Sequence, residues 1–214
     1  MIEDNNRRIF NNKYIFHGWG FGSGTGAIFI LNKPFVEFTN QFLESHSDIN
    51  TVVDIGCGDW QIGRHLNLGN KKYIGCDVSD YILKKTKAKF ASANREFLHI
   101  DAVNDELPKG DLVILKEVLQ HLCNRDACRI LSKISVFPHV IIQSSIYDNY
   151  DRQKFLPSST DIRNGEFRPF NITQFDNRYK LVKKYNGGVD YPANVLRKIF
   201  FLPSICKGIF VNKK

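Results

Sequence analysis

The sequence predicts an α/β fold in which a mostly parallel sheet carries helices on both faces. Short apolar segments rich in β-branched residues, such as 51–55 and 140–142, alternate along the chain with segments of helical periodicity. Strands that are apolar on both sides are typical of a parallel sheet buried on both faces. The chain has 214 residues, 43% of them hydrophobic, so it can bury one substantial core. We therefore expect one domain over residues 1–214.

The predicted elements follow one another in a regular order. Apolar residues from Phe35 to Leu43 recur at helical spacing and predict a helix that leads into the first strand. Ser79 is a typical N-cap for a basic helix that ends near Phe90. The remaining helices are expected from about residue 117 and over 128–134, and the strands at 51–55, 72–76, 97–100, 111–115 and 140–142.

The C-terminal part of the chain has a different pattern. Segments 179–184 and 195–201 are strand-like, and only a turn region at Gly187 and Gly188 and a short connection separate them. We expect these two segments to form an antiparallel pair at the edge of the sheet. The irregular segment 147–175 before them is expected to be an insertion within the domain.

The composition excludes several classes of protein. No apolar segment approaches the roughly 20 residues needed to cross a bilayer, and none follows the N-terminal charges as in a secretory signal. The five cysteines include no C-x-x-C pair, so neither a disulfide framework nor a zinc ribbon is indicated. We expect a cytoplasmic protein with no membrane span and with reduced thiols. The net charge of +8 favours a polyanionic partner but does not identify one.

The ends of the predicted strands carry glycines and carboxylates. In a sheet of this kind, ligands bind outside the carboxyl ends of the strands. The first strand leads through Asp54, Gly56, Gly58 and Asp59, where the glycines allow a tight turn close to a ligand. A dinucleotide-binding loop would have a third glycine where this chain has Gln61.

The charge of this loop favours a cationic ligand. Asp54 and Asp59 would repel a pyrophosphate, whereas S-adenosylmethionine (SAM) carries an ammonium and a sulfonium group and no phosphate. The second strand ends at Asp77, 23 positions after Asp54, near the offset of about 20 residues at which an acidic residue binds ribose hydroxyls. Asp101 ends the third strand and is placed to accept a hydrogen bond from the adenine amino group, with a loop or capping role as the alternative.

Four motifs at these strand ends resemble class I SAM-dependent methyltransferases. Residues 53–58 read VDIGCG, 75–77 read GCD, 100–102 read IDA and 111–113 read DLV, in the order that the family has them. The resemblance implies a Rossmann-like, doubly wound, seven-stranded sheet, mostly parallel with a C-terminal antiparallel strand pair. The cofactor contacts expected from it are Gly22, Ser23, Asp54, Gly56, Cys57, Gly58, Trp60, Asp77, Val78, Asp101, Ala102 and Lys116. Among these, Trp60 could instead fill space in the core.

A narrower set of motifs resembles small methyltransferases associated with glycan-modifying genes, viral ones included. These motifs are GWGFGSGTG at 18–26, GDWQ at 58–61, KEVLQHL at 116–122, and DI at 161–162 followed by Gly165 and by RP at 168–169. The resemblance implies transfer of a methyl group to a hydroxyl oxygen of a sugar in a glycan. After the fifth strand such relatives have an Asn-Asp pair where this chain has Ser144 and Ser145, so no role is carried over to that position.

Two segments are expected to close the site. Residues 1–32 are expected to form a glycine-rich lid, because Trp19 and Phe21 favour a loop that folds over the cofactor or the substrate and excludes water. A flexible arm is the alternative. The insertion at 147–175 is expected to bind the acceptor through Tyr147, Asp161 and Arg168. For Arg168, a role as a structural ion-pair partner is the alternative.

A hydroxyl acceptor would benefit from a general base, which is worth about 10²- to 10⁴-fold in rate. Glu117 and His121 lie four positions apart on a predicted helix, so both can face the pocket. His121 titrates near neutrality and is the first candidate, with a packing role as the alternative. Asp148 is the next candidate. A divalent metal held by carboxylates such as Asp101 and Asp148 is possible, but no ligand spacing requires one.

Two other functions remain open at this point. The positive charge also suits an RNA or protein methyltransferase, which would bind RNA in a salt-dependent way. The chain could also be a SAM-binding platform without catalysis, because a fold does not fix a function. The sequence does not determine the acceptor, the methylated position or the oligomeric state.

Overall fold

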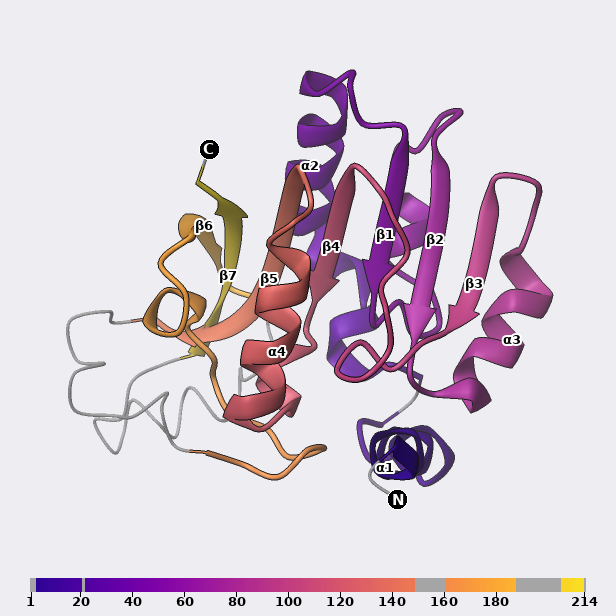
Figure 1. Ribbon diagram of the computed structural model, residues 1–214, viewed down its shortest axis with the longest axis vertical. Helices are drawn as coiled ribbons and strands as arrows, with labels where there is room; N and C mark the ends of the chain where they lie inside the picture. The colour runs from indigo at the N-terminus through magenta and orange to yellow at the C-terminus, as the bar shows by residue number, and fades with distance from the viewer. Residues whose placement is uncertain (1–2, 21, 149–160, 188–204, 214) are drawn as a thin grey trace.

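The computed structural model describes residues 3–20, 22–148, 161–187 and 205–213 (Figure 1). The helices are α1 (Glu3–Ile15), α2 (Phe29–Ser45), α3 (Asp80–Phe90) and α4 (Asn124–Ile134), and the short 3-10 helices are η1 (Gly24–Ala27), η2 (Gly63–His65), η3 (Leu119–His121) and η5 (Ile172–Gln174). The strands are β1 (Thr51–Ile55), β2 (Lys72–Asp77), β3 (Arg95–His99), β4 (Leu112–Lys116), β5 (His139–Tyr147), β6 (Tyr179–Tyr185) and β7 (Ile205–Asn212). None of the described helices is long and apolar enough to cross a membrane.

Among the described residues the sheet has seven strands in the order β3-β2-β1-β4-β5-β7-β6. Strands β1 to β5 are parallel to one another, and β7 runs antiparallel to both β5 and β6. The strand order reverses direction between β1 and β4, which is where ligands bind in sheets of this type. The predicted fold class, a mostly parallel sheet with a C-terminal antiparallel pair, is confirmed.

The second partner of the predicted antiparallel pair lies later in the chain than expected. The first partner, predicted at 179–184, is β6. The strand that pairs with it is β7, which begins at Ile205, whereas the predicted segment 195–201 lies outside the described residues. Lys207 and Gly208 interrupt the apolar pattern of β7, which explains why the pattern did not predict this strand.

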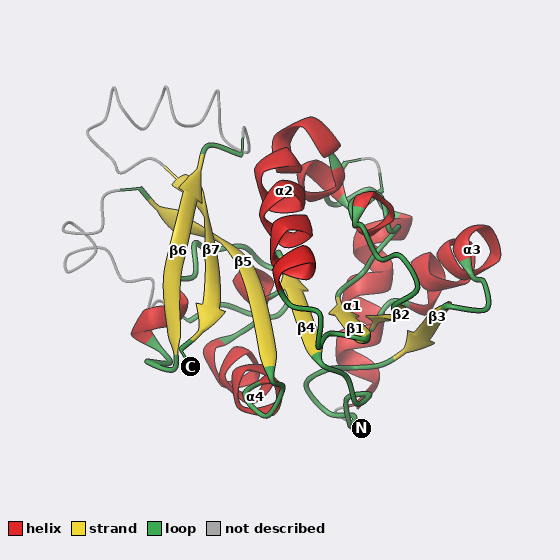
Figure 2. Cartoon of the chain, turned by 90° about the horizontal axis from the view of Figure 1, so that it is seen from above, coloured by secondary structure: helices red, strands yellow, loops and turns green. Residues whose placement is uncertain are grey.

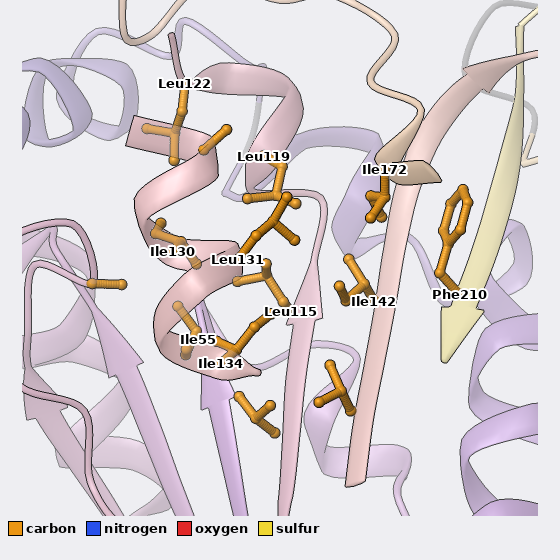
Figure 3. Close-up of a cluster of buried hydrophobic side chains, with 14 of the residues drawn as sticks. Ile55, Leu115, Leu119, Leu122, Ile130, Leu131, Ile134, Ile142, Ile172 and Phe210 are labelled. Atoms are coloured by element: carbon orange, nitrogen blue, oxygen red, sulfur yellow. The ribbon is translucent and has the colours of Figure 1, made fainter. Parts of the chain in front are cut away.

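Helices cover both faces of the sheet. Figure 2 shows α2 and α4 on opposite sides of the strands. On the α4 face, Ile130 and Ile134 belong to one buried cluster with Leu115 of β4 and Ile142 of β5 (Figure 3). A second buried cluster on the other face includes Phe35 of α2. This double cover accounts for the apolar runs of the central strands.

Two local predictions were incomplete or wrong. A helix was expected from about Glu117, but the chain there forms only the 3-10 helix η3 before α4 starts at Asn124. The apolar periodicity of this segment serves packing, because Leu119 and Leu122 are buried. The segment 3–15, expected only as part of a lid, is the helix α1. The predicted N-cap of α3 is confirmed, since the Ser79 hydroxyl accepts a hydrogen bond from the Ile82 amide.

The helix α1 lies at the edge of the sheet to which the parallel strands point (Figure 1). Three of its side chains, Asn6, Phe10 and Tyr14, are buried and recur every four residues. This spacing puts them on one face of the helix. The face contains a polar residue and is short, so its apolar signal in the sequence is weak.

Candidate functional site

A cavity of about 470 Å³ opens at the carboxyl ends of the parallel strands. This volume is typical of a site for a small molecule or cofactor. Residues from the ends of β1, β2 and β4 line it, together with α1, η1 and the loop at 165–167. Of the predicted site residues, those that line the cavity are Ser23, Asp54, Gly56, Cys57, Asp77, Val78, Asp101, Ala102, Lys116, Glu117 and His121.

The turn after β1 brings its backbone close to a neighbouring loop. Gly56 has φ +75°, a left-handed conformation that other residues rarely adopt. A Cβ atom at this position would lie 2.3 Å from Cγ2 of Val118, which also lines the cavity. Gly58 follows with φ +54°, and its amide donates to Asp77 Oδ2 at 2.9 Å. Gly58 therefore shapes the loop, although it does not line the cavity.

Asp54 and Asp77 are buried carboxylates at the ends of β1 and β2. The Tyr73 hydroxyl donates to Asp54, and the Ser79 amide donates to Asp77 Oδ1 at 2.8 Å. Burial raises the pKa of both carboxyls to about 6, so both are mainly ionised at neutral pH. These two negative charges stand on the cavity wall at the positions that the sequence predicted.

Asp101 connects the third strand to the N-terminal helix. Its carboxylate accepts hydrogen bonds from the Val103 amide at 3.0 Å and from the side chains of Asn104 at 2.8 Å and Asn6 at 3.1 Å. It therefore caps a local turn, as one of the two expectations proposed, and also lines the cavity. Asn6, which the sequence did not single out, holds α1 against this edge.

The glycine-rich segment docks onto the loop after β1. The Asp59 amide donates to the Ser23 hydroxyl, and the Ser23 amide donates to Asp59 Oδ2, both at 3.2 Å. Tyr14 of α1 lies within hydrogen-bond distance of the same hydroxyl, at 3.2 Å. Gly22 does not line the cavity, but a Cβ there would lie 2.4 Å from Asp59 Oδ2. Phe21 lies outside the described residues.

Lys116, at the end of β4, also binds the glycine-rich segment. Its Nζ atom donates to the Gly26 carbonyl at 2.6 Å. Burial lowers the pKa of Lys116 to about 8, although the charge of Glu117 opposes this shift. Lys116 therefore contributes a positive charge at neutral pH among the carboxylates of the wall.

Glu117 faces the cavity from a strained backbone position. It has φ +58°, which is uncommon for a residue with a Cβ atom. Lys207 of β7 donates to its carboxylate, as do Gln120 at 2.7 Å and Gln143 at 3.1 Å. Burial alone would raise the pKa of Glu117, but the charges of Lys207 and Lys116 lower it below its ordinary value. Glu117 is thus an ionised and fully engaged carboxylate.

His121 lies in η3 with its ring on the cavity wall. Its Nδ1 atom is 2.9 Å from the Glu166 carbonyl oxygen. Within the part of the chain that the structure describes, Nε2 has no hydrogen-bond partner. Burial lowers the pKa of His121, which favours the neutral imidazole. Trp19 and Phe167 pack beside the ring, with centroids at 5.4 and 5.7 Å.

Several predicted site residues lie away from the cavity. Trp60 is buried in the core, where it contacts Tyr73 and Phe97, so the core alternative describes its position. Tyr147 and Asp148, at the end of β5, do not line the cavity. The structure therefore does not bring Asp148 together with the other catalytic candidates.

The two remaining acceptor candidates support the segment that carries His121. Asp161 Oδ1 accepts a hydrogen bond from the Asn124 amide at 2.7 Å, at the start of α4. Arg168 is buried and donates to the Leu122 carbonyl at 2.8 Å. Neither residue lines the cavity. Residues 149–160 of the predicted insertion lie outside the described residues.

Sequence reasoning missed several residues of the wall. Those are Asn6, Phe10, Tyr14, Gln120 and Phe167. They come from α1, from η3 and from the loop after residue 161, where no strand end marked them. The four-residue spacing of the first three was the one available signal. Among the described residues, no three His, Cys, Asp or Glu side chains group as metal ligands.

The charge distribution fits the cofactor that the sequence suggested. The carboxylates of Asp54, Asp59, Asp77 and Asp101 line the cavity, where they would oppose a phosphate and attract a cation. Ionised Asp54 and Asp77 in particular suit the ammonium and the ribose hydroxyls of SAM. The residues present therefore fit SAM.

Part of the chain is similar to known methyltransferases. Residues 53–136 match a family model described as a methyltransferase domain. A 73-residue segment is 30% identical to an uncharacterized methyltransferase of Mycobacterium bovis, covering 33% of this chain and 37% of that protein. The matched segment thus spans little more than a third of the length of this relative.

Solved structures share the fold over more of the chain. Magnesium protoporphyrin IX methyltransferase from Synechocystis PCC 6803 with bound SAM has a TM-score of 0.60 and 16% identity, covering 98% of both chains. The N-terminal domain of EvdMO1, in the presence of S-adenosylhomocysteine (SAH) and D-fucose, has a TM-score of 0.58 and 11% identity, covering 83% of this chain and 82% of that one. These structures show that the chain shares the fold of SAM-dependent methyltransferases, and the comparisons do not distinguish a glycan-associated subgroup.

Proposed function

We propose, from the methyltransferase-domain match at residues 53–136 and the methyltransferase fold around it, that this protein transfers a methyl group from SAM to a hydroxyl oxygen of a sugar in a glycan. The observation that carries the proposal is the position of His121. Its Nε2 atom, without a partner among the described residues, stands on the wall of the same cavity as the carboxylates of Asp54 and Asp77.

The cofactor would be held by the residues at the strand ends. Asp77 would accept from the ribose hydroxyls and Asp101 from the adenine amino group, as their positions after β2 and β3 suggest. Asp54 would face the ammonium group, and Gly56 would let the loop backbone turn tightly beside the cofactor. When bound, SAM supplies an electrophilic methyl group on its sulfonium.

The protein's own contribution to the reaction would be positioning and proton transfer. His121 would accept the hydroxyl proton at Nε2 as general base. Glu117 is engaged by Lys207 and two glutamines, so it would orient the acceptor and stabilise the protonated imidazole rather than take the proton. Segment 1–32 would act as the lid that excludes water, since Ser23 and Gly26 are already tied to the cavity loops.

The surroundings of His121 support a sugar as the acceptor. The rings of Trp19 and Phe167 give flat apolar surfaces, and Glu117 and Gln120 give polar groups on the same wall. A sugar ring offers both C–H faces and hydroxyls, which such a mixed wall can bind. The EvdMO1 domain, which has the same fold, was solved in the presence of D-fucose. Residues 147–175 would add the remaining acceptor contacts.

The direct test is methyl transfer from isotopically labelled SAM to a panel of sugars, oligosaccharides and RNA, with and without divalent metal. Label on a sugar hydroxyl is the expected result. His121→Asn should lose at least about 10²-fold in kcat while SAH binding stays close to that of the wild type. Asp54→Asn, as the matched control, should weaken SAH binding itself.

Two outcomes would replace the proposal. Label on RNA alone, with binding that weakens steeply as salt rises, would favour the nucleic-acid acceptor that the +8 charge suits. SAH binding without transfer to any acceptor or to a cell extract would favour a non-catalytic platform.

A further inference from the structure

The loop at 165–168 runs beside η3 and fixes its backbone. The Gly165 amide donates to the His121 carbonyl at 2.8 Å, and the Arg168 amide donates to the Gln120 carbonyl at 3.0 Å. Gly165 has φ +91°, a conformation that suits glycine. Two backbone hydrogen bonds thus join the loop to η3 next to the cavity.

The Arg168 side chain completes this connection. Its Nη1 atom donates to the Leu122 carbonyl at 2.8 Å and lies 3.4 Å from the Leu119 carbonyl, and its Nη2 atom donates to Asn124 Oδ1 at 2.5 Å. The guanidinium also stacks on Phe170, 4.6 Å from the ring centroid. Arg168 is only 6% exposed, so its contacts are to the carbonyls of the turn and not to solvent.

The same loop determines which nitrogen of His121 carries the proton. The Glu166 carbonyl oxygen lies 2.9 Å from Nδ1, and a carbonyl oxygen can only accept a hydrogen bond. The neutral ring must therefore carry its proton on Nδ1, because the opposite tautomer would bring two lone pairs together. Nε2 is then the nitrogen with a free lone pair.

We propose that Arg168 is a positioning residue for His121: it holds the 165–168 loop against η3 so that the Glu166 carbonyl keeps the imidazole in its Nδ1–H form. This role rests on the proposed function of His121 as general base. The planar guanidinium reaches two carbonyls at the two ends of one turn, which a single ammonium group cannot do with the same geometry. Arg168 thus acts through His121 and not on the acceptor.

The test measures the tautomer directly in the folded protein without substrate. Long-range ¹H–¹⁵N correlation spectra at about pH 8, where the imidazole is neutral, distinguish Nδ1–H from Nε2–H. A His121→Gln spectrum assigns the signal among the six histidines. The variants are Arg168→Met, Arg168→Lys and, as a matched control, Arg129→Met, which removes an exposed arginine of α4.

The wild type and Arg129→Met should show the Nδ1–H form. Arg168→Met should show a mixture of tautomers and at least a tenfold lower kcat for methyl transfer, with KM for SAM little changed. Arg168→Lys should lie between them. If Arg168→Met does not fold, the wild-type tautomer and Arg168→Lys decide the question.

An Nε2–H form in the wild type would overturn the proposal, as would a folded Arg168 variant that retains the wild-type tautomer while kcat falls. A different result would contradict the proposed methyltransferase function. A wild-type protein with the Nδ1–H tautomer and no methyl transfer would contradict the methyltransferase assignment, while a mixture of tautomers in Arg168→Met would still show that Arg168 controls the tautomer of His121.

Discussion

Lys207 donates to the carboxylate of Glu117 and so joins β7 to the residue that follows β4. The lysine is 1% exposed and the glutamate side chain 13% exposed, which makes this a buried ion pair. Ser145 of β5 lies 3.2 Å from the same Nζ atom. The pair therefore connects three neighbouring strands at Glu117, which lines the cavity.

Removing one partner of this pair should be costly. Lys207→Met leaves the Glu117 charge buried and uncompensated, so we expect the free energy of unfolding to fall by about 3–5 kcal/mol in urea denaturation. The double variant Lys207→Met, Glu117→Gln should recover most of this loss. Lys72→Met is the matched control, because Lys72 pairs with Glu96 at the surface, and should cost less than about 1 kcal/mol. Equal losses in the two lysine variants would contradict the buried-pair interpretation.

Replacing Gly56, which follows β1, with a residue that has a side chain should destabilise the protein. Gly56→Ala combines backbone strain with a clash against Val118, so we expect a loss of about 2–4 kcal/mol in the free energy of unfolding. Gly69→Ala is the control, since Gly69 has φ +53° but no atom within 4 Å of an added Cβ. It should lose only about 1 kcal/mol. The difference between the two measures the close approach alone.

Cofactor binding should weaken as the pH falls through about 6. Asp54 and Asp77 have their pKa values raised to about 6, so protonation there removes the negative charges that would attract SAM or SAH. Calorimetry between pH 7 and pH 5 should show an affinity loss of about tenfold for each carboxylate that contacts the ligand. Asp54→Asn should bind weakly at both values and show a shallower pH dependence. An affinity independent of pH would argue against contact with these carboxylates.

The same two carboxyls should affect the ligand-free protein in the opposite direction. Their folded-state pKa values lie above the ordinary value of 3.8, so the folded state binds protons more tightly than the unfolded chain. Their contribution to stability is fully present below about pH 4 and is lost as the pH rises through about 6. The double variant Asp54→Asn, Asp77→Asn lacks both groups. Between about pH 4 and pH 6, the slope of its unfolding free energy against pH should therefore be less negative than that of the wild type.

The docked glycine-rich segment should contribute to cofactor affinity. Ser23→Ala removes the acceptor for the Asp59 amide and the partner of Tyr14, which loosens the segment over the cavity. We expect Kd for SAH to rise by about three- to tenfold with little change in Tm. Ser132→Ala, at an exposed position of α4, is the control and should leave Kd unchanged. A wild-type Kd in Ser23→Ala would mean that the segment does not act as a lid.

Most of the sheet could be predicted because its strands are locally apolar. Thr51–Ile55 forms a strand with the predicted bounds, since its branched residues face helices on both sides. The strand β7 could not be predicted in this way, because it contains the buried Lys207, whose charge is paired with Glu117, 90 positions earlier. Nor could α1, whose buried face begins with Asn6 and depends on Asp101 as its partner.

The residues at the strand ends of the cavity were easier to predict than the rest of its wall. Asp54 and Asp77 lie at the ends of β1 and β2, and Gly56 and Asp101 follow strands, so their place in the fold depends on the sheet alone. His121 was predicted to line the pocket from a helix, and it does so from a 3-10 turn. That turn is held by hydrogen bonds from Arg168, 47 positions away, which leave no local pattern in the sequence.

The position of β7 between β5 and β6 has a consequence for the order of events during synthesis. All the other described strands leave the ribosome before β7, and β6 has no neighbour in the sheet until β7 arrives. Until then β5 is an open edge that can pair with another chain. During the same interval Glu117 lacks Lys207, the partner of its carboxylate. A nascent chain that ends before residue 205 would therefore carry the parallel strands β1 to β5 with β5 as an unpaired edge, and at this stage pairing with another chain is most favoured.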